Sequence, residues 1–399
     1  MRAPGGSALL LLGLGLCALA LRPQLVGLSP LLPRVEADLG LSHTVAGLLV
    51  TIPVLCMGVC APLAPALLRR VGSVRAIALC LTLIALGGLA RAGAPAAAAL
   101  LALTFVLGAG MGLAGALLPV VVKEGVRSRP AFATGVYVTG INLGSALSSA
   151  GAIPLAGLTG GWRGPLAIFS LATAALVPLW LVVTRRLAAP AASAPVATGP
   201  VARSGVVWVL VLLFSTLGVT FYGLNAWLPD AYTERGWSEA AAGGLVAVLN
   251  IAALPASLAV PYFADRRGSR RAYLLGAAVV FVAGTIGLAA LPGGAWLWVV
   301  LCGTSNGALF ALLLTLPLDV ADRPASVGAI AGLMLGVGYC VAALSPVVLG
   351  AVRDATGSFT AVLWLIAACA LLLVAGSHRL TPLRLRAGAE RLQVGAGAA

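Results

Sequence analysis

The sequence predicts an all-α membrane protein with twelve transmembrane helices in two pseudo-symmetric six-helix bundles. Three observations lead to this fold class: an apolar composition, a regular succession of apolar stretches, and a repeat that relates the two halves. Of the 399 residues, 61% are hydrophobic and only 9% are charged, whereas soluble domains carry about 25% charged residues. The composition therefore excludes a soluble enzyme and a soluble binding domain.

Twelve apolar stretches follow one another along the chain, and most approach the roughly 20 residues that a membrane helix needs. None alternates between apolar and polar residues, as the strands of a membrane β-barrel do. The stretches cover residues 8–31, 44–67, 75–93, 97–121, 132–155, 165–184, 205–228, 240–262, 272–291, 296–317, 326–350 and 359–376. We therefore expect a chain embedded almost entirely in the lipid bilayer. The first stretch imitates a signal peptide, but it continues to about Leu32, so we expect an uncleaved first helix.

One segment differs from the rest because it is rich in Ala, Pro and Ser and lacks helical periodicity. We interpret this segment as a linker between two sets of six helices. The predicted domains are an N-terminal bundle at 1–184, a cytoplasmic linker at 185–205, a C-terminal bundle at 206–376 and a cytoplasmic tail at 377–399.

The basic residues predict the orientation. Nineteen Lys and Arg residues fall in the termini and one set of alternate connections, whereas only Arg34, Arg91, Arg163, Arg235 and Arg353 fall in the other set. By the positive-inside rule, both termini are cytoplasmic in a multi-pass protein of the cytoplasmic membrane. The cations are scattered between apolar runs, so the net charge of +14 does not predict nucleic-acid binding.

The two halves of the chain resemble each other. Pro65, Arg70, Gly72 and Arg75 recur 196 residues later as Pro261, Arg266, Gly268 and Arg271. Leu118-Pro119 recurs as Leu316-Pro317. Matches in the same order indicate a parallel duplication, which is typical of transporters with a binding site between two bundles.

The residues 261–271, PYFADRRGSRR, are similar to the loop signature of the major facilitator superfamily. Within it, Leu21-Arg22-Pro23, Pro30–Pro33 and Trp227-Leu-Pro229 resemble the cyanate permease and nitroimidazole transporter family, although Ala20 stands where that family usually has Asn. The resemblance implies the major facilitator fold and alternating access. It also implies a gating latch made of Arg70, Gly72, Asp265, Arg266, Gly268 and Arg271; the alternative is an ordinary charged turn.

Arg22 is the one cation that falls inside an apolar stretch and belongs to neither set of connections. A charged group at that depth costs at least about 2.5–3.5 kcal/mol unless it meets water, a partner or a ligand. No carboxylate stands in the middle of any stretch. We therefore predict that Arg22 binds an anionic solute. The alternatives are snorkelling to the outer face, or bonding to carbonyls freed by Pro23 and Gly27.

Other polar or aromatic residues at mid-span are candidates for the same substrate site. They are Ser29, Tyr137, Asn142, Tyr222, Asn225, Asn250, Asn306 and Tyr339. The alternative for each is a hydrogen bond between helices. The family resemblance implies that helices 1, 4, 7 and 10 line the cavity, which favours Tyr222, Asn225 and Asn306.

No arrangement of residues predicts catalysis. His43 and His378 stand near opposite faces of the membrane, and no phosphate-binding Gly-Lys-Ser/Thr motif occurs. The seven cysteines lie in apolar stretches without the spacing of a metal site. We therefore expect no enzymatic activity, no cofactor and no metal ion.

Together these features predict a secondary active transporter for a small anionic or dipolar solute, cyanate-like or a small organic anion. We expect a monomer, with coupling to protons or to a counter-solute. Three alternatives remain: a drug or nitro-aromatic exporter on the same fold, a membrane enzyme, and a non-transporting sensor. The enzyme needs converging His, Asp and Glu residues, and the sensor needs a longer extension than the 23 residues of the predicted tail.

Overall fold

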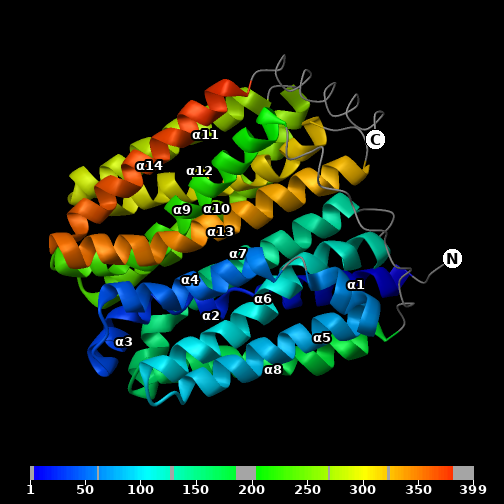
Figure 1. Ribbon diagram of the computed structural model, residues 1–399, viewed down its shortest axis with the longest axis horizontal. Helices are drawn as coiled ribbons and strands as arrows, with labels where there is room; N and C mark the ends of the chain where they lie inside the picture. The colour runs from blue at the N-terminus through cyan, green and yellow to red at the C-terminus, as the bar shows by residue number, and fades with distance from the viewer. Residues whose placement is uncertain are drawn as a thin grey trace.

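The computed structural model describes residues 4–60, 63–125, 130–185, 204–267, 270–320 and 324–380. These residues form helices and connections without strands, which confirms the all-α class. The first half contains α1 (Pro4–Leu19), α2 (Pro23–Val26), the 3-10 helix η1 (Ser29–Leu31), α3 (Leu32–Leu39), α4 (His43–Val59), α5 (Ala64–Ala92), α6 (Ala97–Gly125), α7 (Pro130–Thr159) and α8 (Arg163–Thr184). The second contains α9 (Gly205–Glu234), α10 (Glu239–Arg267), α11 (Arg270–Ala290), η4 (Pro292–Gly294), α12 (Ala295–Val320), α13 (Pro324–Thr356) and α14 (Phe359–Arg379). We call them the N half and the C half; Figure 1 shows one above the other.

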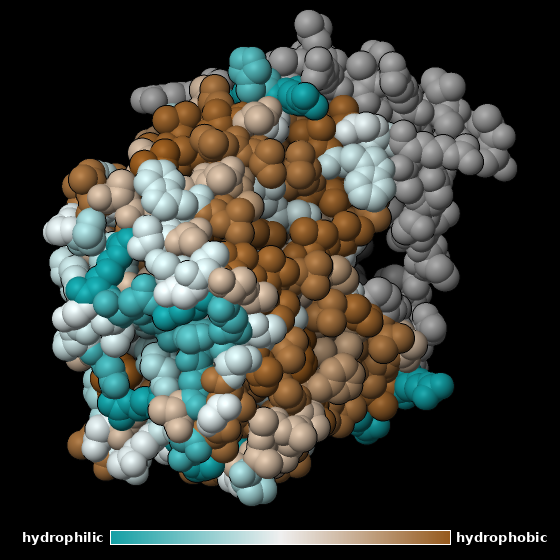
Figure 2. All heavy atoms as spheres, turned by 60° about the vertical axis from the view of Figure 1, so that its left-hand side comes forward, coloured by the Kyte–Doolittle hydropathy of each residue, from teal (hydrophilic) through white to brown (hydrophobic). Residues whose placement is uncertain are grey.

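The outer surface is suited to lipid. Among the described residues, eleven segments are long and apolar enough to cross a membrane, and α4, with 17 residues, is shorter. Large apolar side chains such as Leu12, Phe105 and Leu147 are more than half exposed. Figure 2 shows a broad apolar surface beside a polar end of the molecule. This distribution is typical of a multi-pass membrane protein, whose outward side chains face hydrocarbon.

The first predicted helix, 8–31, is not continuous. The α-helix ends at Leu19, and Arg22 precedes the short helix α2, which begins at Pro23. Proline has no N–H to donate and disfavours helical geometry at the residue before it. Pro30 and Pro33 divide the chain again into η1 and α3. The break places Arg22 at a gap in the helix rather than in a regular turn.

The predicted boundary between the second and third helices lies at a turn within α5. Gly72 has φ 79° and ψ 163°, so residues 64–71 and 73–92 are two helical segments. A positive φ is readily adopted by glycine and costs other residues free energy. The predicted stretch 44–67 therefore corresponds to α4 together with the first residues of α5. Most of the predicted linker and nearly all of the predicted tail lie outside the described residues.

The two halves meet through two main helix pairs. Helix α4 packs along α13, and α7 packs along α10. The backbones of the first pair are in contact, since a Cβ added to Gly47 would lie 2.6 Å from the carbonyl oxygen of Pro346. Close approach of this kind is typical of small residues between membrane helices. The space between the halves therefore lies between these pairs, next to α1, α9 and α12.

Candidate substrate site

Arg22 joins the two halves at the centre of the molecule. Its side chain is buried, and its Nη1 donates a hydrogen bond of 2.7 Å to the hydroxyl of Tyr222 on α9. The guanidinium carbon also lies 5.8 Å from the centre of the Tyr222 ring. The helix break before Pro23 allows this placement, because the chain leaves α1 three residues before Arg22. The guanidinium has five N–H donors, of which Tyr222 uses one.

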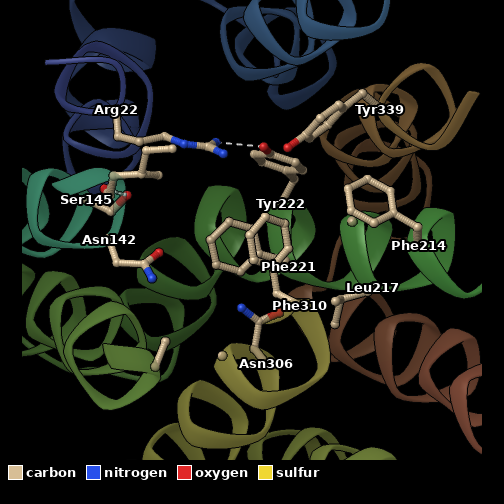
Figure 3. A pocket seen from close by; sticks show the side chains of 14 residues that line it. Arg22, Asn142, Ser145, Phe214, Leu217, Phe221, Tyr222, Asn306, Phe310 and Tyr339 are labelled. Atoms are coloured by element: carbon tan, nitrogen blue, oxygen red, sulfur yellow. Dashed lines mark hydrogen bonds between the residues drawn. The ribbon is translucent and has the colours of Figure 1, made fainter. Parts of the chain in front are cut away.

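A cavity opens around this guanidinium, between the two halves (Figure 3). It offers about 50 Å³ to the centres of water-sized molecules, whereas one water needs about 10–15 Å³. A solute of a few heavy atoms therefore fits. The fourteen lining residues come from both halves and include no Asp or Glu; they are Arg22, Ile141, Asn142, Ser145, Phe214, Leu217, Gly218, Phe221, Tyr222, Ala253, Asn306, Gly307, Phe310 and Tyr339.

The cavity wall is mostly aromatic on the C-half side. Phe214 contacts Tyr339 edge to face, with ring centres 5.2 Å apart, and lies 6.1 Å from Phe310. Figure 3 shows the Tyr339 side chain directed toward Arg22 and Tyr222. The amide oxygen of Asn306 is buried and accepts no hydrogen bond from the described residues. The site thus combines one cation, flat apolar rings and a few amide or hydroxyl groups.

Five of the predicted substrate-binding residues line this cavity: Arg22, Asn142, Tyr222, Asn306 and Tyr339. The other four lie outside its lining. Ser29 is buried in η1, and Tyr137 is half-buried on α7. Asn250 donates a hydrogen bond of 3.1 Å to the amide oxygen of Asn225, which joins α10 to α9. Asn225 and Asn250 thus form a hydrogen bond between helices, which is the alternative to substrate binding for these residues.

The apolar lining residues are not among the predicted site residues, because a phenylalanine in a membrane helix carries no signal of its own. A signal existed in their spacing from Tyr222. Phe214, Leu217, Gly218, Phe221 and Tyr222 follow the i, i+3, i+4, i+7, i+8 pattern of one helix face. Ser145 likewise stands three residues after Asn142 on α7.

This fold agrees with a comparison of the sequence with known families. Residues 10–343 match the Major Facilitator Superfamily. The chain belongs to that superfamily. The cyanate transport protein CynX of Escherichia coli (strain K12) is 32% identical over 94% of this chain and 98% of its own length. The 2-nitroimidazole transporter of the same organism is 31% identical over 91% and 93%. These two relatives confirm the resemblance stated from the sequence motifs.

A solved structure of the superfamily has the same fold. A bacterial homologue of the human lysosomal transporter Spinster, in an inward-facing and unoccupied conformation, superposes with a TM-score of 0.73. The alignment covers 98% of this chain and 97% of that one, at 16% identity. The two chains therefore share the major facilitator fold, whose two pseudo-symmetric bundles were predicted from the repeat.

Several of the predicted gating residues lie among the described residues, at the end of the molecule that contains Gly72. Arg70 is exposed beside that turn. The Arg266 guanidinium stacks on the ring of Tyr262 at 4.4 Å, and Nη2 of Arg271 donates to the carbonyl of His378. Gly268 and the side chain of Asp265 lie outside the described residues. The latch therefore stays a prediction.

The opposite end, which we call the His43 end, carries polar contacts between the halves. It contains the connections α3–α4, α7–α8, α9–α10 and α13–α14, at the left of Figure 1. Arg34 on α3 pairs with Glu239 on α10 at 2.6 Å. His43 and Thr44 on α4 both contact the carboxylate of Asp354 on α13. These contacts hold the His43 end closed.

Arg91 differs from its predicted place in a connection. It lies in the last turn of α5 and is fully buried in the N half. Its Nη2 donates to the backbone oxygen and to the side-chain oxygen of Gln24, both at 2.7 Å. Gln24 in turn donates to Ser170 on α8. This network fixes α2 against α5 and α8.

Proposed function

We propose that this protein moves a small anion, or a small planar solute with a strongly negative group, across the cytoplasmic membrane by alternating access. The observation that carries the proposal is the Arg22 guanidinium in a cavity whose lining contains no carboxylate. A guanidinium is permanently charged, and its planar array of donors matches carboxylate-like groups. In a site without an acidic partner, the solute supplies the negative charge.

The relatives support this substrate class. One is named for cyanate and another for 2-nitroimidazole. Cyanate is a small anion, and the nitro group of a nitroimidazole carries partial negative charge on two oxygens. Both kinds of group suit a guanidinium, and both are small enough for the described cavity. We propose cyanate-like ions and small organic anions as the first solutes to test.

Export of a nitro-aromatic solute is a second candidate, favoured by the aromatic wall. Phe214, Phe221 and Phe310 line the same cavity as the guanidinium. An aromatic solute would stack on these rings while its nitro group meets Arg22. Transport assays in right-side-out and inverted membrane vesicles separate uptake from export by direction.

The proposed transport cycle uses the contact between the halves. The bond from Arg22 to Tyr222 joins them. A bound anion competes for the same N–H donors, so binding changes a contact between the halves directly. Rocking about the α4–α13 and α7–α10 pairs then exposes the site to one side at a time.

Energetics requires coupling for uptake of an anion. Moving one negative charge inward costs about 2.3 kcal/mol per 100 mV of inside-negative potential. We propose proton or counter-solute coupling for uptake, whereas export of an anion is electrically downhill. We also propose that the protein works as a monomer, with no enzymatic step, and with both termini in the cytoplasm, as the distribution of basic residues indicates.

The test measures solute binding by the purified protein. Binding of cyanate, formate and 2-nitroimidazole is detected as a shift of the thermal unfolding temperature. We expect Arg22→Ala to weaken anion binding at least tenfold, because a hydrogen bond to a charged group contributes about 1.5–3 kcal/mol. Arg22→Lys keeps the charge but loses the planar donors, so an intermediate loss is expected. Arg185→Ala removes an exposed arginine outside the cavity and serves as the matched control. Equal stabilisation of wild type and Arg22→Ala by anions would contradict the proposal.

A further inference from the structure

A second group of polar side chains lies between the two halves, at the His43 end and apart from the substrate cavity. It consists of Glu36 on α3, His43 on α4 and Asp230 on α9. One nitrogen or oxygen of each lies within 4.8 Å of the corresponding atoms of the other two. Two of the three side chains come from the N half and one from the C half.

Two carboxylate oxygens in this group are buried without a hydrogen-bond partner among the described residues. They are Oδ2 of Asp230, whose residue is only 6% exposed, and Oε1 of Glu36. A buried carboxylate oxygen without a partner costs several kcal/mol, since it has lost its hydration. The free energy falls when a cation binds between the two groups, so the arrangement points to a positively charged ligand.

The orientation of His43 supports a metal cation as that ligand. Its Nδ1 lies 3.0 Å from Oδ1 of Asp354, and Thr44 donates its backbone N–H and its hydroxyl to the other oxygen of that carboxylate. When Nδ1–H donates to Asp354, Nε2 carries a lone pair. Nε2 lies 3.5 Å from Oε2 of Glu36, which is beyond an ordinary hydrogen bond. A histidine whose second nitrogen donates to a carboxylate is the usual form of a metal-binding histidine.

The charges around the group leave it negative. The neighbouring Arg353 pairs with Glu234 at 2.9 Å, and Arg34 pairs with Glu239. Glu36 and Asp230 form no ion pair with an arginine among the described residues, although Arg353 is near enough to influence Glu36. With both carboxylates ionised and the imidazole neutral, the group carries a charge of −2, which one divalent cation neutralises.

We propose that Glu36, His43 and Asp230 bind a divalent transition-metal cation, for which Zn²⁺ is the best match, and that this ion holds the His43 end closed. Zn²⁺ accepts imidazole nitrogen and carboxylate oxygen in a tetrahedral site, with water in a fourth position. Mg²⁺ and Ca²⁺ prefer ligand sets made of oxygen alone. Because the ligands come from both halves, the bound ion slows the opening of this end and thereby inhibits transport.

The first experiment measures metal binding by the purified full-length protein. Co²⁺ is used as a spectroscopic substitute for Zn²⁺, because thiolate ligands would add an intense charge-transfer band and the chain has seven free cysteines. We expect one Co²⁺ per chain with ligand-field bands and no thiolate band, displaced by Zn²⁺. His43→Ala should weaken binding at least tenfold. His378→Ala, at the other histidine of the chain, is the matched control.

Two near-isosteric variants keep this test independent of folding. Glu36→Gln and Asp230→Asn retain the volume of the side chain and remove one charged ligand each. We expect each to weaken Co²⁺ binding at least tenfold while the thermal unfolding without metal stays cooperative. A wild type that binds no metal at this site, or variants that bind as well as wild type, would overturn the proposal.

The second experiment tests closure. We expect Zn²⁺ to slow hydrogen exchange at the His43 ends of α4 and α13 in wild type and in His378→Ala, but not in His43→Ala. Metal binding without slower hydrogen exchange would refute the closing role of the ion, but not the metal site itself. If protons rather than a metal neutralise the carboxylates, Co²⁺ gives no ligand-field bands and Zn²⁺ does not change the hydrogen exchange. The metal proposal then fails. Neither measurement depends on the transported solute.

Discussion

Two buried arginines show how the surroundings decide what a charged side chain does. Arg22 faces a cavity and interacts with the hydroxyls of Tyr222 and Tyr339, so it retains donors among its five N–H groups for a solute. Arg91 is fully buried and its Nη2 is held by Gln24 through two oxygens, whereas Nε and Nη1 have no partner in the described structure. The cavity reaches the first guanidinium but not the second. We therefore propose solute binding for Arg22 and helix packing for Arg91.

The Gln24–Arg91 pair gives a stability prediction at this scale. Gln24→Leu removes an acceptor from a buried charge, so we expect about 2 kcal/mol of destabilisation. Ser170→Ala removes only a neutral hydrogen-bond partner of Gln24 and should cost about 1 kcal/mol. The double variant Gln24→Leu/Arg91→Met contains no buried charge and should recover most of the loss. Unfolding of purified protein in mixed micelles gives these values. A double variant less stable than Gln24→Leu would contradict the account.

At the scale of helices, the same contact occurs in both halves. In the N half, Gly108 and Gly112 of α6 pack against the backbone of α4 near Pro53 and Cys56. In the C half, Gly303 and Gly307 of α12 pack in the same way against α10. Each of the latter glycines stands 195 residues after its counterpart, which agrees with the spacing of the sequence repeat. The duplication thus preserves a helix–helix contact as well as a loop.

This contact gives a prediction for α6. A Cβ on Gly112 would collide with the carbonyl oxygen of Cys56, whereas a Cβ on Gly115 meets no atom within 4 Å. Both residues lie on the same helix, so their substitutions differ in packing and little in helix propensity. We expect Gly112→Val to destabilise the protein by about 3 kcal/mol and Gly115→Val to cost less than a third of that. Equal losses in the two variants, measured by unfolding in mixed micelles, would show that the contact is unimportant.

At the scale of the whole molecule, the two halves are joined at the His43 end and around Arg22. The ion pair between Arg34 and Glu239 and the contacts of Asp354 with α4 all connect one half to the other. Opening this end requires these contacts to break, while the α4–α13 and α7–α10 packing guides the motion. The free energy of the closed state is therefore spread over several weak contacts, which suits a transporter that must open repeatedly.

The Arg34–Glu239 pair tests this view. Both side chains are partly exposed, so the pair contributes about 0.2–1 kcal/mol. Glu239→Gln should therefore raise the open population at the His43 end by up to about fivefold. The reversed pair Arg34→Glu/Glu239→Arg should restore it. Hydrogen exchange at the first turns of α4 and α10 measures the opening. Unchanged exchange in Glu239→Gln would show that this pair does not hold the halves together.

The all-helical membrane fold and most of the helices follow from the sequence alone, because hydropathy and helix length are local properties of the chain. The repeat around Gly72 and Gly268 also indicated two related bundles before any contact was known. The depth of Arg22 in an apolar stretch marked it as a candidate for the same reason: the cost of burying a charge depends on its position along the chain.

Which polar residues meet depends on the packing of the helices against one another. Tyr222 and Asn225 stand three residues apart on α9, yet one lines the cavity and the other bonds to Asn250. The difference depends on how each helix is rotated about its axis and on the break before Pro23, which apolar patterns do not encode when a helix is hydrophobic on all sides. The meeting of Glu36 and His43 with Asp230, about two hundred residues later, likewise follows from packing between the halves.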